Sequence, residues 1–275
     1  MTTWRLITYQ DYDGFKNMAI DEAIMKSHSQ GQSPPTLRFY GWDPPALSLG
    51  YFQKLEKRID LKACQTQGID VVRRLTGGRA ILHDQELTYS LTIREDLNLL
   101  DSSIIKSYRQ ISQGLVKGLK KLGLAVTLEP RKNGQKSPKG KSAACFDTPS
   151  WYEVVIEGKK LIGSAQTRKE DTILQHGSLP LNIDAELIFS LFKISSPQRR
   201  QRLIDIFNQK STALEEHLTE DDELTIERLQ DCLVAGLAEH FKVDIQPGSL
   251  SAKEENLAEK LSKNKYSQSE WTARR

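Results

Sequence analysis

The chain has 275 residues, enough for one large domain or two ordinary ones, and its hydrophobic content of 38% can supply a sizeable core. With 39 basic and 36 acidic residues, the net charge of +3 is too balanced for nucleic-acid binding to be the main activity. No apolar run approaches the roughly 18 residues of a membrane span, and the first residues lack a secretory pattern, so we expect a cytoplasmic protein without a membrane partner.

The N-terminal half alternates short strands with helices. Apolar residues recur at helical spacing over residues 15–28 and, most clearly, over residues 104–122. A short helix is expected within residues 52–68, and Trp42 is expected to pack at the corner of a turn rather than contact a ligand. The expected strands are residues 4–9, 37–40, 46–50, 70–74, 79–82, 87–93 and 125–128.

Residues 129–142 are rich in Lys, Gly and Pro, which predicts a mobile surface loop. Helical patterns dominate from residue 184 onward. We therefore predict an α+β fold in which a mixed β-sheet has flanking helices, as one domain over residues 1–275. Its core spans about residues 1–183, and a helical C-terminal elaboration spans about residues 184–275. The later strands are expected at residues 151–156, 159–166, 172–181 and 242–245.

The stretch from residue 71 to residue 90 combines arginines, a glycine pair and a His-Asp dipeptide between two expected strands. Backbone amides next to glycines can form an anion-binding concavity, and neighbouring arginines strengthen it. A hairpin turn with a solvated basic face is the alternative, since Gly-Gly is a common hairpin signal. The residues concerned are Arg73, Arg74, Gly77, Gly78, His83 and Asp84.

Cys145 is the candidate nucleophile, because thiolate chemistry needs a partly exposed sulfur near positive charge and a lysine-rich segment precedes this residue. A buried, unreactive thiol is the alternative. The other cysteines, Cys64 and Cys232, are far away in sequence, so no disulfide framework or zinc site is predicted. The hairpin that follows can bring Lys159 or Lys160 near Cys145, but only one of them can point inward because alternate strand residues face opposite sides.

Two histidines, His83 and His176, are further candidates to line a site, and sequence spacing cannot decide which one is near Cys145. Gly158 and Gly163 suit a close approach of backbone to ligand.

Five segments in order resemble the lipoate-protein ligase and octanoyltransferase superfamily, and the resemblance is closest to the single-domain, cysteine-dependent octanoyltransferases of bacteria. Nearly the whole chain takes part. The resemblance implies a biotin/lipoate protein ligase-like catalytic domain with a tunnel for a medium-length acyl chain. The segments are NMAIDEAIM (17–25), RFYGWDPPALSLGYFQ (38–53), VVRRLTGGRAILHD (71–84), ACFDTPSWYEVVIEGKKLIGSAQTR (144–168) and LQHGSLPLNID (174–184).

The resemblance also implies roles for individual residues. Cys145 falls on the acyl-accepting thiol of the transferases, and Lys160, rather than Lys159, falls on the shared active-site lysine. The residues expected to form the acyl pocket or bind substrate are Arg73, Arg74, Gly77, Gly78, His83, Asp84, Gly163, Ser164, His176 and Gly177.

The implied activity is a two-step transfer in lipoate biosynthesis. Octanoyl-acyl-carrier protein is the expected donor, Cys145 forms a thioester, and Lys160 hydrogen-bonds the acyl carbonyl. The expected acceptor is a specific lysine of the glycine-cleavage H protein or of the lipoyl domain of a dehydrogenase E2. Neither a metal ion nor a nucleotide is expected to be needed.

Two alternatives remain open from the sequence. In an ATP-dependent lipoate-protein ligase, which would use ATP and Mg²⁺, Arg73 and Arg74 are natural phosphate partners. The Cys145 context argues against this alternative, as does Arg79, which stands where such ligases usually carry a third glycine. The second alternative is a non-catalytic acyl-binding module.

The basic residues before Cys145 suggest a steering role. Because acyl-carrier proteins are acidic, this loop is a candidate to attract the donor by charge complementarity, and a solvated loop without function is the alternative. The residues are Arg131, Lys132, Lys136, Lys139 and Lys141.

Overall fold

The computed structural model describes residues 2–130, 152–218 and 224–274. Its strands are β1 (Thr3–Ile7), β2 (Asp11–Tyr12), β3 (Thr36–Trp42), β4 (Ala46–Leu49), β5 (Asp70–Arg73), β6 (Ile81–His83), β7 (Glu86–Arg94), β8 (Val126–Pro130), β9 (Tyr152–Ile156), β10 (Lys159–Lys169), β11 (Thr172–Pro180) and β12 (Asp244–Pro247). Its helices are α1 (Gly14–Ser29), α2 (Leu61–Thr66), α3 (Ile104–Lys121), α4 (Ala185–Ser190), α5 (Pro197–Lys210), α6 (Ile226–Phe241), α7 (Ala252–Leu261) and α8 (Ser269–Thr272).

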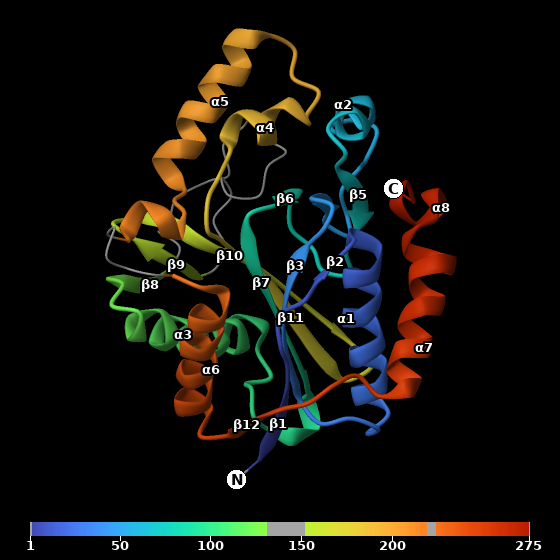
Figure 1. The fold of residues 1–275 in the computed structure, drawn as a ribbon, viewed down its shortest axis with the longest axis vertical. Coiled ribbons are helices and arrows are strands. Elements are labelled where there is room, and N and C mark those ends of the chain that lie inside the picture. Colours follow the sequence, from blue (N-terminus) through green and yellow to red (C-terminus); the bar gives the residue numbers. More distant parts are fainter. Residues whose placement is uncertain (1, 131–151, 219–223, 275) are drawn as a thin grey trace.

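A mixed sheet forms the centre of the molecule (Figure 1). Its strand order is β12-β1-β3-β7-β11-β10-β9-β8, with β2 attached to β3, and a smaller sheet has the order β5-β4-β6. Strands β3, β7, β11 and β10 are antiparallel neighbours, whereas β1 is parallel to both β3 and β12. The predicted α+β class, with a mixed sheet and flanking helices, is confirmed.

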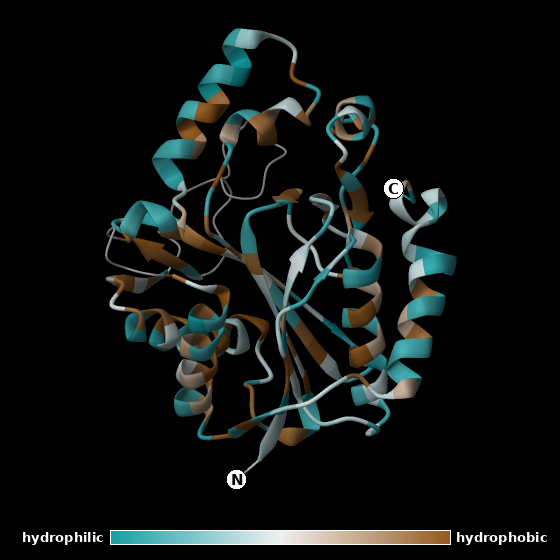
Figure 2. Ribbon diagram, in the orientation of Figure 1, coloured by the Kyte–Doolittle hydropathy of each residue, from teal (hydrophilic) through white to brown (hydrophobic). Residues whose placement is uncertain are grey.

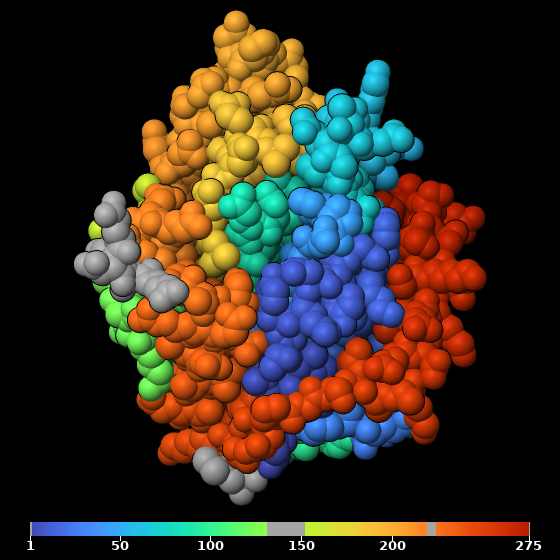
Figure 3. Space-filling model, in the orientation of Figure 1, coloured from blue at the N-terminus to red at the C-terminus, as the bar shows by residue number. Residues whose placement is uncertain are grey.

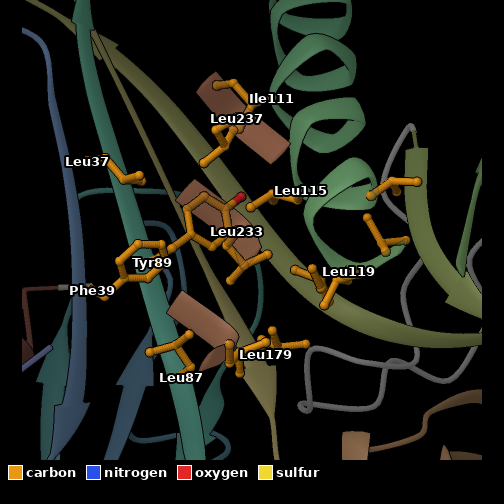
Figure 4. Packing of buried hydrophobic residues seen from close by; sticks show 14 of the residues in the cluster. Leu37, Phe39, Leu87, Tyr89, Ile111, Leu115, Leu119, Leu179, Leu233 and Leu237 are labelled. Atoms are coloured by element: carbon orange, nitrogen blue, oxygen red, sulfur yellow. The ribbon is translucent and has the colours of Figure 1, made fainter. Parts of the chain in front are cut away.

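Strand β7 shows how the sheet is layered between helices, because its side chains alternate between the two faces of the sheet and different helices cover these faces. One face is apolar and packs against α3 and α6, as the labelled side chains of Figure 4 show. The opposite face is also buried but polar, and it looks toward α1. The apolar residues are Leu87, Tyr89, Leu91 and Ile93; the polar residues are Glu86, Thr88, Ser90 and Thr92.

The helices after residue 184 contact several parts of the molecule. Helix α6 packs on α3, α7 packs on α1, and α4 packs on α5 beside the smaller sheet. Figure 3 shows the last helices, in red, lying against the N-terminal residues, in blue. Hydrophilic residues predominate on α5 and α7 (Figure 2), as expected of helices with one face in solvent. The predicted division into a core and a C-terminal elaboration stays a prediction.

One predicted boundary needs correction. Residues 129 and 130 belong to β8, where Glu129 pairs with Glu153 and Pro130 with Tyr152, so this strand continues into the sequence predicted to be a loop. The rest of the predicted loop, its five basic residues and Cys145 lie outside the described residues. Within the described ranges, no helix is long and apolar enough to cross a membrane.

Candidate functional site

A cavity lies on the polar face of the central sheet. Strand register places two rows of residues across β3, β7, β11 and β10, and in both rows the side chain on β10 is small or absent. Space therefore remains above β10. The first row is Arg38, Ser90, His176 and Ala165; the second is Tyr40, Thr88, Ser178 and Gly163.

The cavity wall combines apolar and polar residues. Helix α1 contributes Met18, β3 contributes Trp42, and β6 contributes Ile81, which give the wall apolar surface. The other lining residues are Tyr40, Ser48, Arg74, Gly78, His83, Thr88, Gly163, Ser164, Ala165, His176, Gly177 and Ser178. An apolar space with a few fixed polar groups is typical of a site for a small organic ligand.

Glu86, a buried carboxylate at the start of β7, organises one side of the wall. His83 Nδ1 lies 2.8 Å from Glu86 Oε1, and His83 Nε2 lies 2.8 Å from Ser48 Oγ. Thr88 and Ser178 also donate hydrogen bonds to the Glu86 carboxylate. Burial raises the pKa of Glu86, but the interaction with His83 and these hydrogen bonds outweigh it and lower the pKa below its usual value.

Trp42 packs on the other side of His83. The two rings are stacked with centroids 4.0 Å apart and planes inclined by 12°. The indole N–H donates to Thr88 Oγ1 over 2.8 Å, so its polar atom is satisfied. Trp42 packs at a corner as predicted, but it also lines the cavity, so the expectation that it does not contact a ligand stays a prediction.

Asp21, on α1, organises the opposite side of the site. Its Oδ1 accepts hydrogen bonds from Arg38 Nη1 and from Ser90 Oγ, each over 2.9 Å. Its Oδ2 accepts from Tyr40 over 3.0 Å and lies 3.3 Å from His176 Nδ1. Burial raises the pKa of Asp21, but the His176 hydrogen bond and the Arg38 charge lower it below its usual value overall.

His176 connects this cluster to the loop after β5. Its Nε2 lies 2.6 Å from Thr76 Oγ1. Burial lowers the pKa of His176 below its usual value, although Asp21 opposes this shift. Because a carboxylate can only accept, Nδ1–H donates to Asp21, while Nε2 lies against the Thr76 hydroxyl.

The arginine–glycine loop, defined here as residues 73–79, uses its two arginines as internal braces. Arg73 is buried and donates from Nε and Nη2 to the Thr272 carbonyl, at 3.0 and 2.6 Å, which ties α8 to β5. Its Nη1 donates to the carbonyls of Gly50, Tyr51 and Gln53.

Arg74 braces the same loop from inside. Its Nη2 donates to the carbonyls of Gly77 and Arg79, both over 2.7 Å, and its Nη1 donates to Ser48. Gly78 has a φ of +94°, and a Cβ on it would lie 2.8 Å from Arg74 Nη2, so glycine is required there.

Gly177 is required for a different reason. It lies opposite Ser164 and Tyr89 in the sheet, and those side chains hydrogen-bond to each other over 2.8 Å. A Cβ on Gly177 would lie 2.4 Å from Ser164 Oγ and 2.6 Å from Tyr89 Cε1. The absent side chain therefore lets these two groups meet beneath the cavity wall.

Lys160 is buried on β10, and its Nζ lies 2.9 Å from Glu153 Oε1. Lys159 points the other way, with 38% of its side chain exposed. The expectation that one lysine of the pair faces inward is confirmed, and it is Lys160. Strand register pairs Val154 with Ile162, so Glu153 lies beside the part of β10 where Gly163 lines the cavity.

The structure brings most of the predicted site residues together. Four of the described ones are not part of the cavity wall: Arg73, Gly77 and Lys160 do not line it, and Asp84 lines a neighbouring hollow beside Asp184. Burial, together with Glu86 and Asp184, raises the pKa of Asp84. The predicted residues that line the cavity are Arg74, Gly78, His83, Gly163, Ser164, His176 and Gly177.

Sequence reasoning missed the two buried carboxylates that organise the cavity wall. Asp21 and Glu86 were not singled out, although Asp21 and Glu22 interrupt an otherwise apolar helical stretch. Buried charges need partners, so that interruption was the available signal. No group of His, Cys, Asp and Glu side chains within the described ranges is arranged to hold a metal ion.

Comparisons with known proteins agree with this geometry. Residues 13–238 match a family model described as the lipoyl protein ligase A/B catalytic domain. The chain is 47% identical over 277 aligned positions to the octanoyltransferase LipM of Kyrpidia tusciae, and 46% identical over 276 to that of Clostridioides difficile; both alignments cover 100% of each chain. The fold is similar to a bipartite lipoate protein ligase from Thermoplasma acidophilum, with a TM-score of 0.80 and 26% identity over 99% of this chain and 97% of that one.

Proposed function

The chain belongs to the lipoyl protein ligase A/B catalytic domain family, and on this premise we propose that it transfers an octanoyl group between two carrier proteins through a thioester on Cys145. Relatives named octanoyltransferase match the full chain at 42–47% identity, which supports an acyltransferase of protein lipoylation. The reaction requires neither a metal ion nor a nucleotide.

The transfer divides into two nucleophilic displacements. In the first, the Cys145 thiolate attacks the octanoyl thioester carbonyl of the donor, a new carbon–sulfur bond forms, the bond to the donor sulfur breaks, and the donor leaves as a thiolate that takes up the proton Cys145 has lost. In the second, the ε-amine of an acceptor lysine attacks octanoyl-Cys145, an amide bond forms, and the proton lost by the amine returns to the Cys145 sulfur. Dividing the reaction lets two bulky proteins dock in turn.

The observation that carries this proposal is the buried ammonium of Lys160. This ammonium donates to the Glu153 carboxylate, and an ammonium is a strong N–H donor. Glu153 is the second residue of β9 and lies beside the wall of the cavity. Strand β9 follows the segment that contains Cys145. A donor preorganised in a water-poor site stabilises the oxyanion that develops on the acyl carbonyl, and this is the role we assign to Lys160.

The cavity is the site we propose for the octanoyl chain. Met18, Trp42, Ile81 and Ala165 offer apolar surface to it. Each methylene moved from water into such surroundings contributes about 0.8 kcal/mol.

The arginines do not favour adenylate chemistry. Arg73 and Arg74 would be the phosphate partners of a ligase, but their guanidinium groups already donate to backbone carbonyls of the protein. We therefore propose octanoyl-acyl-carrier protein as the donor, and the glycine-cleavage H protein or the lipoyl domain of a dehydrogenase E2 as the acceptor.

A transfer assay without ATP tests the proposal. The protein is mixed with octanoyl-acyl-carrier protein and either acceptor, and the acceptor is weighed by intact-mass spectrometry. We expect one octanoyl amide on the acceptor, and none on an acceptor whose target lysine is replaced by arginine. Modification that requires free octanoate or lipoate together with ATP would instead identify a ligase.

A further inference from the structure

A groove of about 280 Å³ lies on the outer side of the arginine–glycine loop. Among the described residues that line it, four of six are cationic and none is acidic. We call it the basic groove, and its lining residues are Phe52, Gln53, Lys54, Lys57, Arg58 and Arg79.

The basic groove shares a wall with the cavity. Arg79 follows Gly78, which lines the cavity, and the nearest atom to a Cβ placed on Gly77 would be Phe52 Cδ2 at 3.9 Å. A molecule seated in the groove is therefore separated from the cavity by a single turn of glycine-rich backbone.

Two further features mark the groove as a contact surface. The Phe52 ring is 70% exposed, which makes it a large apolar side chain placed among charges. The positive edge continues past the groove: Arg274 Cζ lies 4.7 Å and Lys169 Nζ 5.0 Å from the centroid of the Tyr51 ring, which packs edge-on against Phe52. An exposed aromatic ring surrounded by cations suits a partner that is acidic with an apolar centre.

The hydrogen bonds of Arg73 and Arg74 bear on which cations this contact surface presents. Arg73 donates to carbonyls outside the loop, and Arg74 donates to those of Gly77 and Arg79. The cations presented outward beside the cavity include Lys54 and Lys57, both of which are exposed. The donor delivers the acyl chain to the cavity, so a surface next to the cavity wall suits donor docking.

We propose that the basic groove is the docking site for the acidic carrier protein that delivers the acyl thioester. The inference rests on the proposed acyl transfer and adds the surface that recognises the donor. Opposite charges increase the rate of encounter, and salt screens this effect.

The test compares two donors on two variants. The first variant reverses two charges in the groove, Lys54→Glu with Lys57→Glu. The control makes the same change in charge on exposed lysines elsewhere, Lys120→Glu with Lys253→Glu. The donors are octanoyl-acyl-carrier protein and octanoyl-pantetheine, a small thioester without a protein surface. The readout is the second-order rate of enzyme acylation, at low and at high ionic strength, with the thermal midpoint of each variant as a check on folding.

We expect the groove variant to lose about tenfold in rate with the carrier protein at low salt and much less at high salt. Its rate with octanoyl-pantetheine should match that of the unmodified protein, and the control should be unaffected with both donors. The milder pair Lys54→Gln with Lys57→Gln should show a smaller loss of the same kind.

Three results would overturn the inference: an unchanged rate with the carrier protein at low salt, an equal loss in the control, or an equal loss with octanoyl-pantetheine. If the groove variant is acylated at the normal rate by both donors, only the proposed docking site is wrong. If neither donor acylates the unmodified protein, the proposed function fails as well.

Discussion

The arginine–glycine loop and the β9–β10 hairpin are both rich in basic residues and glycine, but they use their cations differently. In the loop, the guanidinium groups of Arg73 and Arg74 donate to backbone carbonyls and hold the loop in shape. In the hairpin, Lys160 is buried with its ammonium at Glu153, beside the cavity wall. A cation that binds backbone carbonyls is part of the structure, whereas a buried ammonium near a cavity is a candidate for chemistry.

The difference predicts opposite kinds of defect when each cation is removed. Changes in the loop should lower stability first, and activity only as a consequence. Changes in the hairpin should lower activity while the fold persists.

The largest effect is expected for Arg73→Met. The change leaves the carbonyls of Thr272, Gly50 and Gln53 without their donor, and we expect it to cost about 3–5 kcal/mol of unfolding free energy. Urea unfolding measures this loss. The exposed Arg199→Met is the matched control, with a change within about 0.5 kcal/mol. A stable Arg73→Met protein that fails only in transfer would instead make Arg73 a substrate-binding residue.

Lys160→Met should slow acyl transfer by about 10²–10³-fold, the usual cost of removing one donor to an oxyanion. Its thermal midpoint should change far less than that of Arg73→Met, since Glu153 retains 21% exposure of its side chain and can be hydrated. Lys159→Met, on the outward face of the same strand, should transfer at the normal rate. Equal transfer rates for the two lysine variants would remove Lys160 from the mechanism.

Local patterns in the sequence predicted much of this molecule. Period-two and helical spacing located the strands and the long helices, and alternation on β10 correctly required that one lysine of the pair face inward. The resemblance to a known family pointed to seven of the fifteen described residues that line the cavity. In particular, His83, Gly163, His176 and Gly177 meet there although more than 90 residues separate the first of them from the last.

Long-range partners could not be predicted from local patterns. Asp21 meets Arg38, Ser90 and His176 only because α1 lies over three strands of the sheet, and no short spacing encodes that contact. For the same reason the role of Arg73 was open: its acceptor, Thr272, lies at the far end of the chain.

Alanine substitutions at the two glycines of the loop should lower the free energy of unfolding by different amounts. Gly78→Ala places a Cβ at a φ of +94° and 2.8 Å from Arg74, so we expect a loss on the order of 1–2 kcal/mol. For Gly77→Ala the nearest atom is Phe52 Cδ2 at 3.9 Å, an ordinary contact, and the loss should be smaller. Chemical denaturation of the two variants decides the point, and an equal loss would show that the loop does not need its left-handed residue.

A smaller effect on stability is expected when the pH is changed, because His176 contacts the loop at Thr76. Burial lowers the pKa of His176 in the folded protein, so the unfolded chain binds the proton more readily. This contribution to stability is fully present above the pKa of about 6.5 that the histidine has in the unfolded chain. It is lost as pH falls toward the lower pKa of the folded protein. From about pH 7.5 to about pH 5.5, the thermal midpoint should therefore fall more for the unmodified protein than for His176→Gln. Parallel curves would show that this histidine is not linked to stability.

The central claim is that Cys145 carries the acyl group, and intact-mass spectrometry of the protein after mixing with octanoyl-acyl-carrier protein, without ATP, tests it most directly. The chain has three cysteines, and burial raises the pKa of Cys64 to about 11, which makes that thiol a poor nucleophile. We predict one hydroxylamine-labile octanoyl adduct that persists in Cys64→Ala and in Cys232→Ala but vanishes in Cys145→Ala. An adduct that survives in Cys145→Ala, or octanoyl transfer to the acceptor by that variant at the normal rate, would contradict the account.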